Sequence, residues 1–315
     1  EWYFSNRGAT FHTEQGIVCV PTLESMCAML PQQSRWPVND LWGLHDWTQP
    51  RVQRYTDDMI YRYGAPESLE DFCLKAQMLN LEGPKAMMEA WQSKRGPGVL
   101  VWMTHPAWPS LICQTYDYYL QPSAAYFALK RGSEPVHVFL NPLNHSVQIS
   151  NNTIHQLRAI TAKAEVYSIS GNKISEKSFH TEVNASSTKD CFSVDVPSPT
   201  TGIMFVKLSL KDEEDKLLSD NFYWLSPDSL NYRELNRLPG VQLKATASID
   251  KIRNKDCIVM KITNTTEKIA LMTELVAADE ARGERLLPVF LSDNFFSLVP
   301  GESQTVTITP ENGLP

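Results

Sequence analysis

Several features that would place a protein in a specialised class are absent from this chain of 315 residues. No apolar run approaches the roughly 18 residues that a membrane-spanning helix needs, so no membrane span is expected. The 6 cysteines are scattered without a Cys-x-x-Cys pair. That spacing argues against a zinc site or a disulfide framework and favours buried free thiols. We therefore expect no metal and no cofactor.

An excess of positive charge is also lacking. Lys and Arg number 29 against 36 Asp and Glu, which gives a net charge of −7 and an isoelectric point of about 5.6. Neither nucleic acid nor an anionic membrane attracts an acidic protein, so general binders of these surfaces are excluded. Hydrophobic residues make up 42% and charged residues 21%, which is typical of a globular protein, and the length predicts two or three domains.

The first part of the chain has the pattern of an α/β protein. Residues 68–91 carry apolar side chains at helical period, with Ser68 and Asp71 at capping-box spacing, and Gly83-Pro84 predicts a kink or break. Residues 98–105, GVLVWMTH, form a continuous apolar run that predicts a strand buried on both faces of a parallel sheet. Alternation of strands and helices is the α/β signature.

The composition changes near Glu134-Pro135. Seven of the 8 tryptophans lie before this point, and short alternating segments separated by turn residues follow it. Two successive sets of about six strands each predict two immunoglobulin-like sandwiches in tandem.

Glu14 is the first candidate for chemistry. It lies in FHTEQG, between an apolar approach and a helix-like segment, where it is either an ordinary loop carboxylate or a catalytic group. The later apolar run ends among Trp102, Thr104, His105 and Trp108. If both strands belong to one parallel barrel, their carboxyl ends open onto the same face. A carboxylate beside tryptophans suits sugar chemistry, because the indole stacks on a pyranose and the carboxylate meets charge at the anomeric carbon.

The stretch GVLVWMTHPAWPSLICQTYDYYLQPSAAYFALKRGSEPVHV resembles the last barrel strand and helix of one branch of glycoside hydrolase family 2. That branch contains the exo-β-glucosaminidases, β-mannosidases and plant endo-β-mannosidases. RYGAPESLEDFCLKAQMLNLEGPKAMMEAW is similar to the helix before that strand. DNFYWLSPDSLNY and LLPVFLSDNFFSLVPGESQTV are similar to the two sandwich domains that follow it. The likeness covers nearly the whole chain, in order.

The resemblance implies a fold and a domain division. Residues 1–133 would be the C-terminal portion of a TIM (β/α)8 barrel, with its last two strands and helices. Residues 134–228 and 229–315 would be the two immunoglobulin-like β-sandwiches. A barrel of this kind needs eight strands, so the resemblance also implies a missing N-terminal part of the same enzyme that carries the acid/base. We expect the chain alone to be inactive.

The resemblance also implies a catalytic role for Glu14. FHTEQGIVCVPTLESM is similar to the end of the seventh barrel strand in that family, so Glu14 falls on the position of the nucleophile of a retaining glycosidase. Glu14 would form a glycosyl-enzyme while a second carboxylate acts as acid and then base.

Six further residues are candidates for substrate binding, each with packing or a structural place at the barrel rim as the alternative. They are Trp102, Trp108, Tyr63, Thr104, His105 and His45. His45 is followed by Asp46, but no serine nucleophile motif accompanies the pair, so we interpret this loop as a pocket rim or as packing.

The expected ligand is an oligosaccharide or polysaccharide with β-linked sugars. The compartment stays open, and a periplasmic or secreted location is favoured over the cytoplasm for a bacterial protein. The alternative hypothesis is a non-catalytic carbohydrate-binding or structural β-sandwich module, which would show a row of exposed aromatic side chains on one sandwich face.

Overall fold

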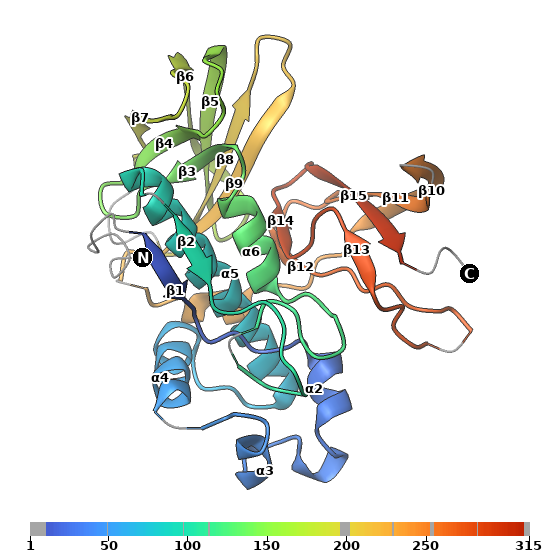
Figure 1. Cartoon of the computed structure of the whole chain (residues 1–315). Helices are drawn as coiled ribbons and strands as arrows, with labels where there is room; N and C mark the ends of the chain where they lie inside the picture. The colour runs from blue at the N-terminus through green and yellow to red at the C-terminus, as the bar shows by residue number, and fades with distance from the viewer. Residues whose placement is uncertain are drawn as a thin grey trace.

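The computed structural model describes residues 11–48, 50–96, 98–112, 114–195, 202–228, 230–252, 255–281 and 283–311. The chain begins with a helical part and continues into two β-rich parts that lie side by side (Figure 1). The helical part holds two strands, β1 His12–Gln15 and β2 Val99–Val101. Its helices are α2 Leu23–Met29, η1 Gln32–Ser34, α3 Asp40–Gly43, α4 Arg51–Tyr63, α5 Leu69–Lys94 and α6 Ala124–Gly132.

Strands β1 and β2 form a parallel pair, as the sequence predicts. His12 lies opposite Val99 and Gln15 opposite Val101, with a shift of register between them. The predicted strand is longer than the observed one, and its predicted burial on both faces is wrong, because the side chain of Leu100 is 56% exposed. The reason is that β2 pairs only with β1 among the described residues. These residues contain no closed barrel.

Helix α5 is the central element of the helical part. Ser68 caps its N-terminus by accepting a hydrogen bond from the Asp71 amide at 3.1 Å, and the Asp71 carboxylate accepts one from the Glu67 amide at 2.9 Å. The helix continues through Pro84 for 26 residues, so the predicted break is absent. Most of the side chains of α5 are buried, and this packing outweighs the poor helical propensity of proline.

The first β-rich part is a two-layer sandwich. One sheet has the order β3-β4-β7, with bounds Val136–Leu140, Ser146–Asn151 and Ser187–Ser193. The other has the order β6-β5-β8-β9, with bounds Lys173–Val183, Leu157–Ser168, Met204–Lys211 and Leu217–Leu225. Inward side chains such as Val138, Ile149, Ala162, Val206 and Leu208 form its core. The described residues of this sandwich form seven strands, where the sequence predicts about six, and the strand that the sequence analysis did not anticipate is β6.

The second β-rich part follows the short helix η2 Arg233–Arg237. Its larger sheet has the order β10-β11-β15-β13, with bounds Lys244–Ile252, Lys255–Thr263, Ser303–Pro310 and Val289–Leu291. Its smaller sheet pairs β12 Ala270–Thr273 with β14 Phe296–Leu298. The core of this sandwich is continuous with that of the helical part. Among the described residues, no helix is long and apolar enough to cross a membrane.

A buried polar network joins α5 to the first sandwich. Glu89 of α5 accepts hydrogen bonds from His137 Nε2 at 3.2 Å, Asn221 Nδ2 at 2.8 Å and the Tyr223 hydroxyl at 2.8 Å. Lys85, one turn earlier on α5, donates to the Phe222 carbonyl at 2.7 Å and lies over the Tyr223 ring. Since each partner comes from β3 or β9, the network fixes the helix on the sandwich.

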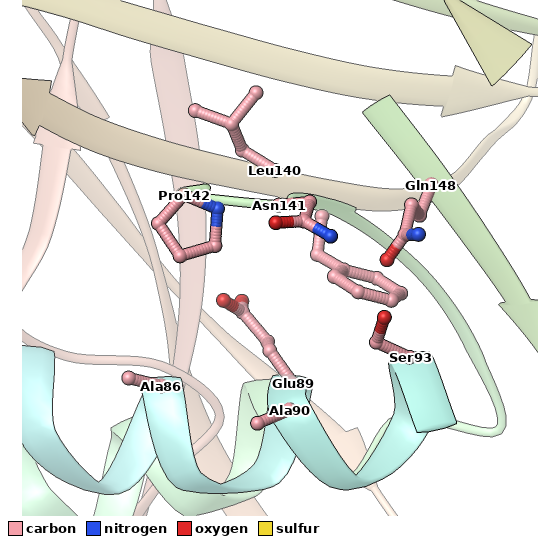
Figure 2. A pocket seen from close by; sticks show the side chains of 9 residues that line it. Ala86, Glu89, Ala90, Ser93, Leu140, Asn141, Pro142 and Gln148 are labelled. Carbon is pink, nitrogen blue, oxygen red and sulfur yellow. The ribbon is translucent and has the colours of Figure 1, made fainter. Parts of the chain in front are cut away.

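A small cavity lies beside this network, between α5 and the ends of β3 and β4. Figure 2 shows Glu89 pointing from the helix toward Asn141 and Pro142, with Gln148 on the facing strand. Its volume is about 20 Å³, which is enough for one water molecule. The Oε1 atom of Gln148 is buried without a hydrogen-bond partner among the described residues. With a volume of about 20 Å³, the cavity is too small to be a sugar-binding site.

Candidate functional site

Glu14 and Trp102 line the same open hollow, whose volume is about 660 Å³. Glu14 projects from β1, and Trp102 directly follows β2. The Trp102 amide donates a hydrogen bond to the Gln15 carbonyl at 2.9 Å, so the parallel pairing brings the two residues together. The remaining lining residues are Gly16, Ile17, Val18, Pro50 and Arg54.

Gly16 permits this close approach of the two strand ends. A Cβ atom built on Gly16 would lie 2.0 Å from the Trp102 carbonyl oxygen, far inside van der Waals contact. Only glycine fits against another backbone at this distance. The glycine that follows Glu14 in the sequence therefore sets the position of Trp102 beside the carboxylate.

A second open hollow of about 430 Å³ adjoins the first. The two share Trp102 and Pro50 as lining residues, and Asp46 and Trp108 also line the second. The side chains of Trp102 and Trp108 are 49% and 48% exposed. Half-exposed indoles facing a hollow are a feature of sites that stack on ligands.

His45 packs against the ring of Trp108. The two rings are stacked, with centroids 6.2 Å apart and an angle of 19° between their planes. His45 Nδ1 lies 2.8 Å from the Pro109 carbonyl oxygen, and the Leu111 amide donates to the His45 carbonyl at 2.9 Å. His45 thus joins the loop after α3 to the loop that carries Trp108, and it lines neither of the two hollows itself.

The other predicted binding residues of the β2 loop, Thr104 and His105, are exposed and line neither hollow. Thr104 acts here through its backbone, because its carbonyl accepts a hydrogen bond from the Tyr116 amide at 2.8 Å. That contact closes the loop after β2 onto the segment before α6.

The expectation that Tyr63 lines a sugar subsite needs correction. Its side chain is 2% exposed, its hydroxyl donates to Glu82 Oε2 at 2.5 Å, and it accepts a hydrogen bond from Trp224 Nε1 at 3.1 Å. Its ring also stacks on Tyr232. Tyr63 lies on the face of α4 that packs against α5 and η2, so it holds the helical part on the first sandwich.

The sequence analysis missed Pro50 and Arg54. Arg54 is an exposed residue of α4, and its guanidinium makes no hydrogen bond or ion pair with another described residue. Pro50 precedes α4, and Arg54 lies one helical turn later on the same face. Their position directly after the predicted rim loop was the only signal for them. Within the described residues, no group of three or more His, Cys, Asp or Glu side chains is arranged to hold a metal ion.

The arrangement supplies one carboxylate beside an aromatic wall. Glu14 is the only acidic residue that lines the first hollow in the described part of the chain. Glycoside hydrolysis needs two carboxyl groups flanking the scissile bond. Among the described residues, the first hollow therefore offers one carboxyl group and not two.

Comparison with known proteins gives matches over most of the chain. Residues 144–227 match the mannosidase Ig/CBM-like domain, and residues 221–314 match the exo-β-D-glucosaminidase Ig-fold domain. An exo-β-D-glucosaminidase of Hypocrea jecorina is 31% identical over 79% of this chain and 31% of the relative. One of Arthroderma benhamiae is 27% identical over 98% of this chain and 38% of the relative.

The fold matches a solved enzyme as well. The exo-chitosanase CsxA of Amycolatopsis orientalis superposes with a TM-score of 0.85 and 25% identity, over 95% of this chain and 39% of that structure. The chain thus spans about a third of the length of the curated relatives it matches. Its sequence and its fold together relate it to the C-terminal portion of the exo-β-glucosaminidase and β-mannosidase branch of glycoside hydrolase family 2.

Proposed function

We propose that the chain is the C-terminal part of a retaining β-glycosidase, with Glu14 as the nucleophile. The observation that carries the proposal is the shared hollow: a carboxylate and a half-exposed indole, from two parallel strands, face one open space of about 660 Å³. Pockets that bind small molecules have volumes of about 300–1,000 Å³. The curated relatives are named as exo-β-D-glucosaminidases, which supports a β-linked glucosaminide, mannoside or related sugar as substrate.

The proposed reaction is the two-step displacement of a retaining glycosidase. Glu14 attacks the anomeric carbon and forms a bond to it as the bond to the leaving oxygen breaks. A second carboxylic acid gives its proton to that oxygen. The same group then takes a proton from water, whose oxygen displaces Glu14 and releases the sugar with its configuration retained. Trp102 stacks on the apolar face of the ring, and the exposed Arg54 guanidinium donates hydrogen bonds to sugar hydroxyls.

The second carboxylate is supplied by an N-terminal part of the same enzyme, as partner of this chain. In this proposal residues 1–133 contribute the last two strands of a barrel, and residues 134–228 and 229–315 are two sandwiches that brace it. The exposed side chains of Phe11 and Leu100 beside the β1–β2 pair support a covering of this kind, because apolar surface next to an unpaired strand edge favours association.

A non-catalytic binding module is less well supported. The aromatic clusters of the two sandwiches are mostly buried, including Tyr223, Trp224, Phe295 and Phe296. They contact the cores or the junctions between the parts. The exposed aromatic side chains of the described sandwich residues, such as Phe179 and Phe290, lie on different sandwiches and form no row.

Trapping the intermediate tests the nucleophile. The chain, joined to the N-terminal part of its enzyme, is treated with a 2-fluoro glycoside and digested, and the labelled peptide is mapped. We expect the label on Glu14, and we expect Glu14→Gln to lower kcat at least about 10³-fold. Glu24→Gln is the matched control, since Glu24 lies in α2 and lines neither hollow. A label on another residue, or an active Glu14→Gln enzyme, would overturn the proposal.

A further inference from the structure

Strand β10, at the edge of the second sandwich, is exposed at all 9 of its positions. In the described part of the chain it pairs with β11 alone, so its other edge carries backbone amides and carbonyls without a strand partner. Figure 1 places β10 at the outer side of the second sandwich, away from the β1–β2 pair at which the N-terminal part of the enzyme is proposed to bind. A long strand with an open edge is a template for pairing with a further strand.

One face of β10 is apolar and uncovered. Ile258 and Met260 of β11 pack against the core of the second sandwich. Ile249 lies opposite the first of them and Ala247 opposite the second, so both project from the core side of the sheet, as Ala245 does two residues earlier. The side chain of Ile249 is nevertheless 73% exposed. The smaller sheet of this sandwich therefore does not reach over β10, and the apolar stripe is open to another chain.

The sequence of β10, KATASIDKI, is complementary to itself in one antiparallel register. The register that places Ala247 opposite Ala247 of a second copy pairs the remaining positions as Lys244 with Asp250, Ala245 with Ile249, and Thr246 with Ser248. Opposite charges then meet at both ends of the paired segment, hydroxyl groups meet on the outer face, and apolar side chains meet on the core face. A shift of one residue would set the apolar face of one copy on the polar face of the other.

Charge at this edge favours self-pairing in that register. Lysine on an edge strand usually opposes pairing with another chain, but each Lys244 here meets the carboxylate of Asp250 from the other copy. Pairing about a two-fold axis uses each β10 edge once, so the assembly closes at two copies. The opposite edge of the same sheet, β13, is only 3 residues long and offers no comparable template.

From this complementarity we propose that β10 is a homodimer interface, at which two copies of the chain join their larger sheets into one antiparallel sheet about a two-fold axis at Ala247. The pairing satisfies the open backbone edge and covers the apolar stripe of each copy. The inference goes beyond the proposed function, and it does not depend on the role of Glu14. One pair of strands makes a small interface compared with the roughly 1,200–2,000 Å² of standard stable complexes, so we expect a Kd in the micromolar range.

Sedimentation velocity of the 315-residue chain over a range of concentrations measures the association. We expect a monomer–dimer equilibrium. Asp250→Lys sets like charges opposite each other at two places in the dimer, and it should weaken the Kd about tenfold or more, which corresponds to about 1.4 kcal/mol. Lys244→Asp should have a similar effect for the same reason. Asp250→Asn, which removes the charge without reversing it, should weaken the Kd less than Asp250→Lys.

The charge swap separates pairing from misfolding. The double variant Lys244→Asp/Asp250→Lys restores opposite charges in the same register and should return the Kd to within about threefold of the parent value. Lys216→Asp is the matched control for net charge, because Lys216 lies in the exposed turn between β8 and β9, and it should leave the Kd unchanged. Leu100→Lys, at the exposed β2 position, tests association through the β1–β2 edge and should also leave the Kd unchanged.

The outcomes decide between this interface and its alternatives. A chain that stays monomeric up to about 100 µM overturns the proposal, because a micromolar Kd would fill the dimer at that concentration. A dimer that Asp250→Lys leaves intact, or that Leu100→Lys alone dissociates, overturns it as well, and so does a folded double variant that stays dissociated. A trapped sugar on a residue other than Glu14 would overturn the nucleophile and leave this interface in place.

Discussion

At the scale of single residues, the carboxyl group of Glu274 has a pKa well above its ordinary value. Burial raises the pKa of this carboxyl to about 7, and the charge of Glu24 on α2 adds to the rise, while Arg285 opposes it. Its Oε1 atom is buried without a hydrogen-bond partner in the described part of the chain. A carboxyl whose folded pKa lies above its unfolded value of 4.5 lowers stability as pH rises from 4.5 through 7.

Glu274→Gln should therefore stabilise the protein at pH 8 and leave its stability at pH 4 nearly unchanged. The gain at pH 8 should be at most about 3 kcal/mol, from the size of the shift and about 1.36 kcal/mol for each pKa unit. Urea unfolding at both pH values measures it. Glu280→Gln, at an exposed position of the following loop, should change stability little at either pH. An equal gain at pH 4 and pH 8 would contradict the explanation.

At the scale of elements, the approach of β1 to β2 decides the geometry of the candidate site. Gly16 contacts the Trp102 carbonyl so closely that no side chain fits between them. Its backbone is not in the left-handed region, so the requirement for glycine comes from this contact alone. The pairing of the strands and the placement of the indole depend on one missing Cβ atom.

Gly16→Ala should destabilise the chain by about 1–3 kcal/mol, because the added methyl group forces the strand ends apart. It should also shift the indole signal of Trp102 in the NMR spectrum. Gly43→Ala is the matched control: no atom lies within 4 Å of its added Cβ, and α3 should gain up to about 1 kcal/mol from the better helix former. Similar losses in both variants, measured by urea unfolding, would disprove the role of the contact.

The elements also show what pattern analysis can and cannot find. The cap of α5 was predictable because Ser68 and Asp71 lie at a spacing that acts locally. Strand β6 was missed because almost all of its residues are exposed and its sequence has no buried alternating face. The continuity of α5 through Pro84 was not predictable, since contacts from other parts of the chain stabilise it.

At the scale of the whole molecule, the His137–Glu89 network links the helical part to the first sandwich. His137 Nε2 lies 3.2 Å from Glu89, and Nδ1 lies 3.2 Å from Glu134, so both ring nitrogens face acceptors. Burial alone would lower the pKa of His137, but these hydrogen bonds raise it above 6.5. Burial alone would raise the pKa of Glu89, but His137 and Lys85 hold it below 4.5.

The signs of the two shifts define a pH window. The stabilisation that Glu89 contributes to the folded state is fully present above pH 4.5 and is lost as the pH falls through its lowered pKa. The stabilisation that His137 contributes is fully present below pH 6.5 and is lost as the pH rises through its raised pKa. The junction should therefore be most stable between pH 4.5 and 6.5. Within this window both members of the pair carry their charges.

His137→Gln should destabilise the chain at pH 6 by about 1–3 kcal/mol, because the buried Glu89 carboxylate loses one of its two cationic neighbours and keeps Lys85. It should also flatten the decline in stability above pH 6.5 that we expect of the parent chain. Thermal unfolding across this range checks both effects. His155→Gln, at an exposed position, should retain the parent profile. A His137→Gln variant with the parent slope would show that another group titrates there.

Local patterns by themselves determined the two sandwiches, the cap of α5 and the position of Glu14 at the end of a strand, because each depends on neighbours within a few residues. The resemblance led us to expect Glu14 and Trp102 on one face, and the structure places them in one hollow. Only the tertiary structure decided that Arg54 joins them and that Tyr63 is buried against Trp224 and Glu82. These relations depend on strand register and on which helix face packs inward. Both are set by contacts between distant parts of the chain, and no local pattern carries them.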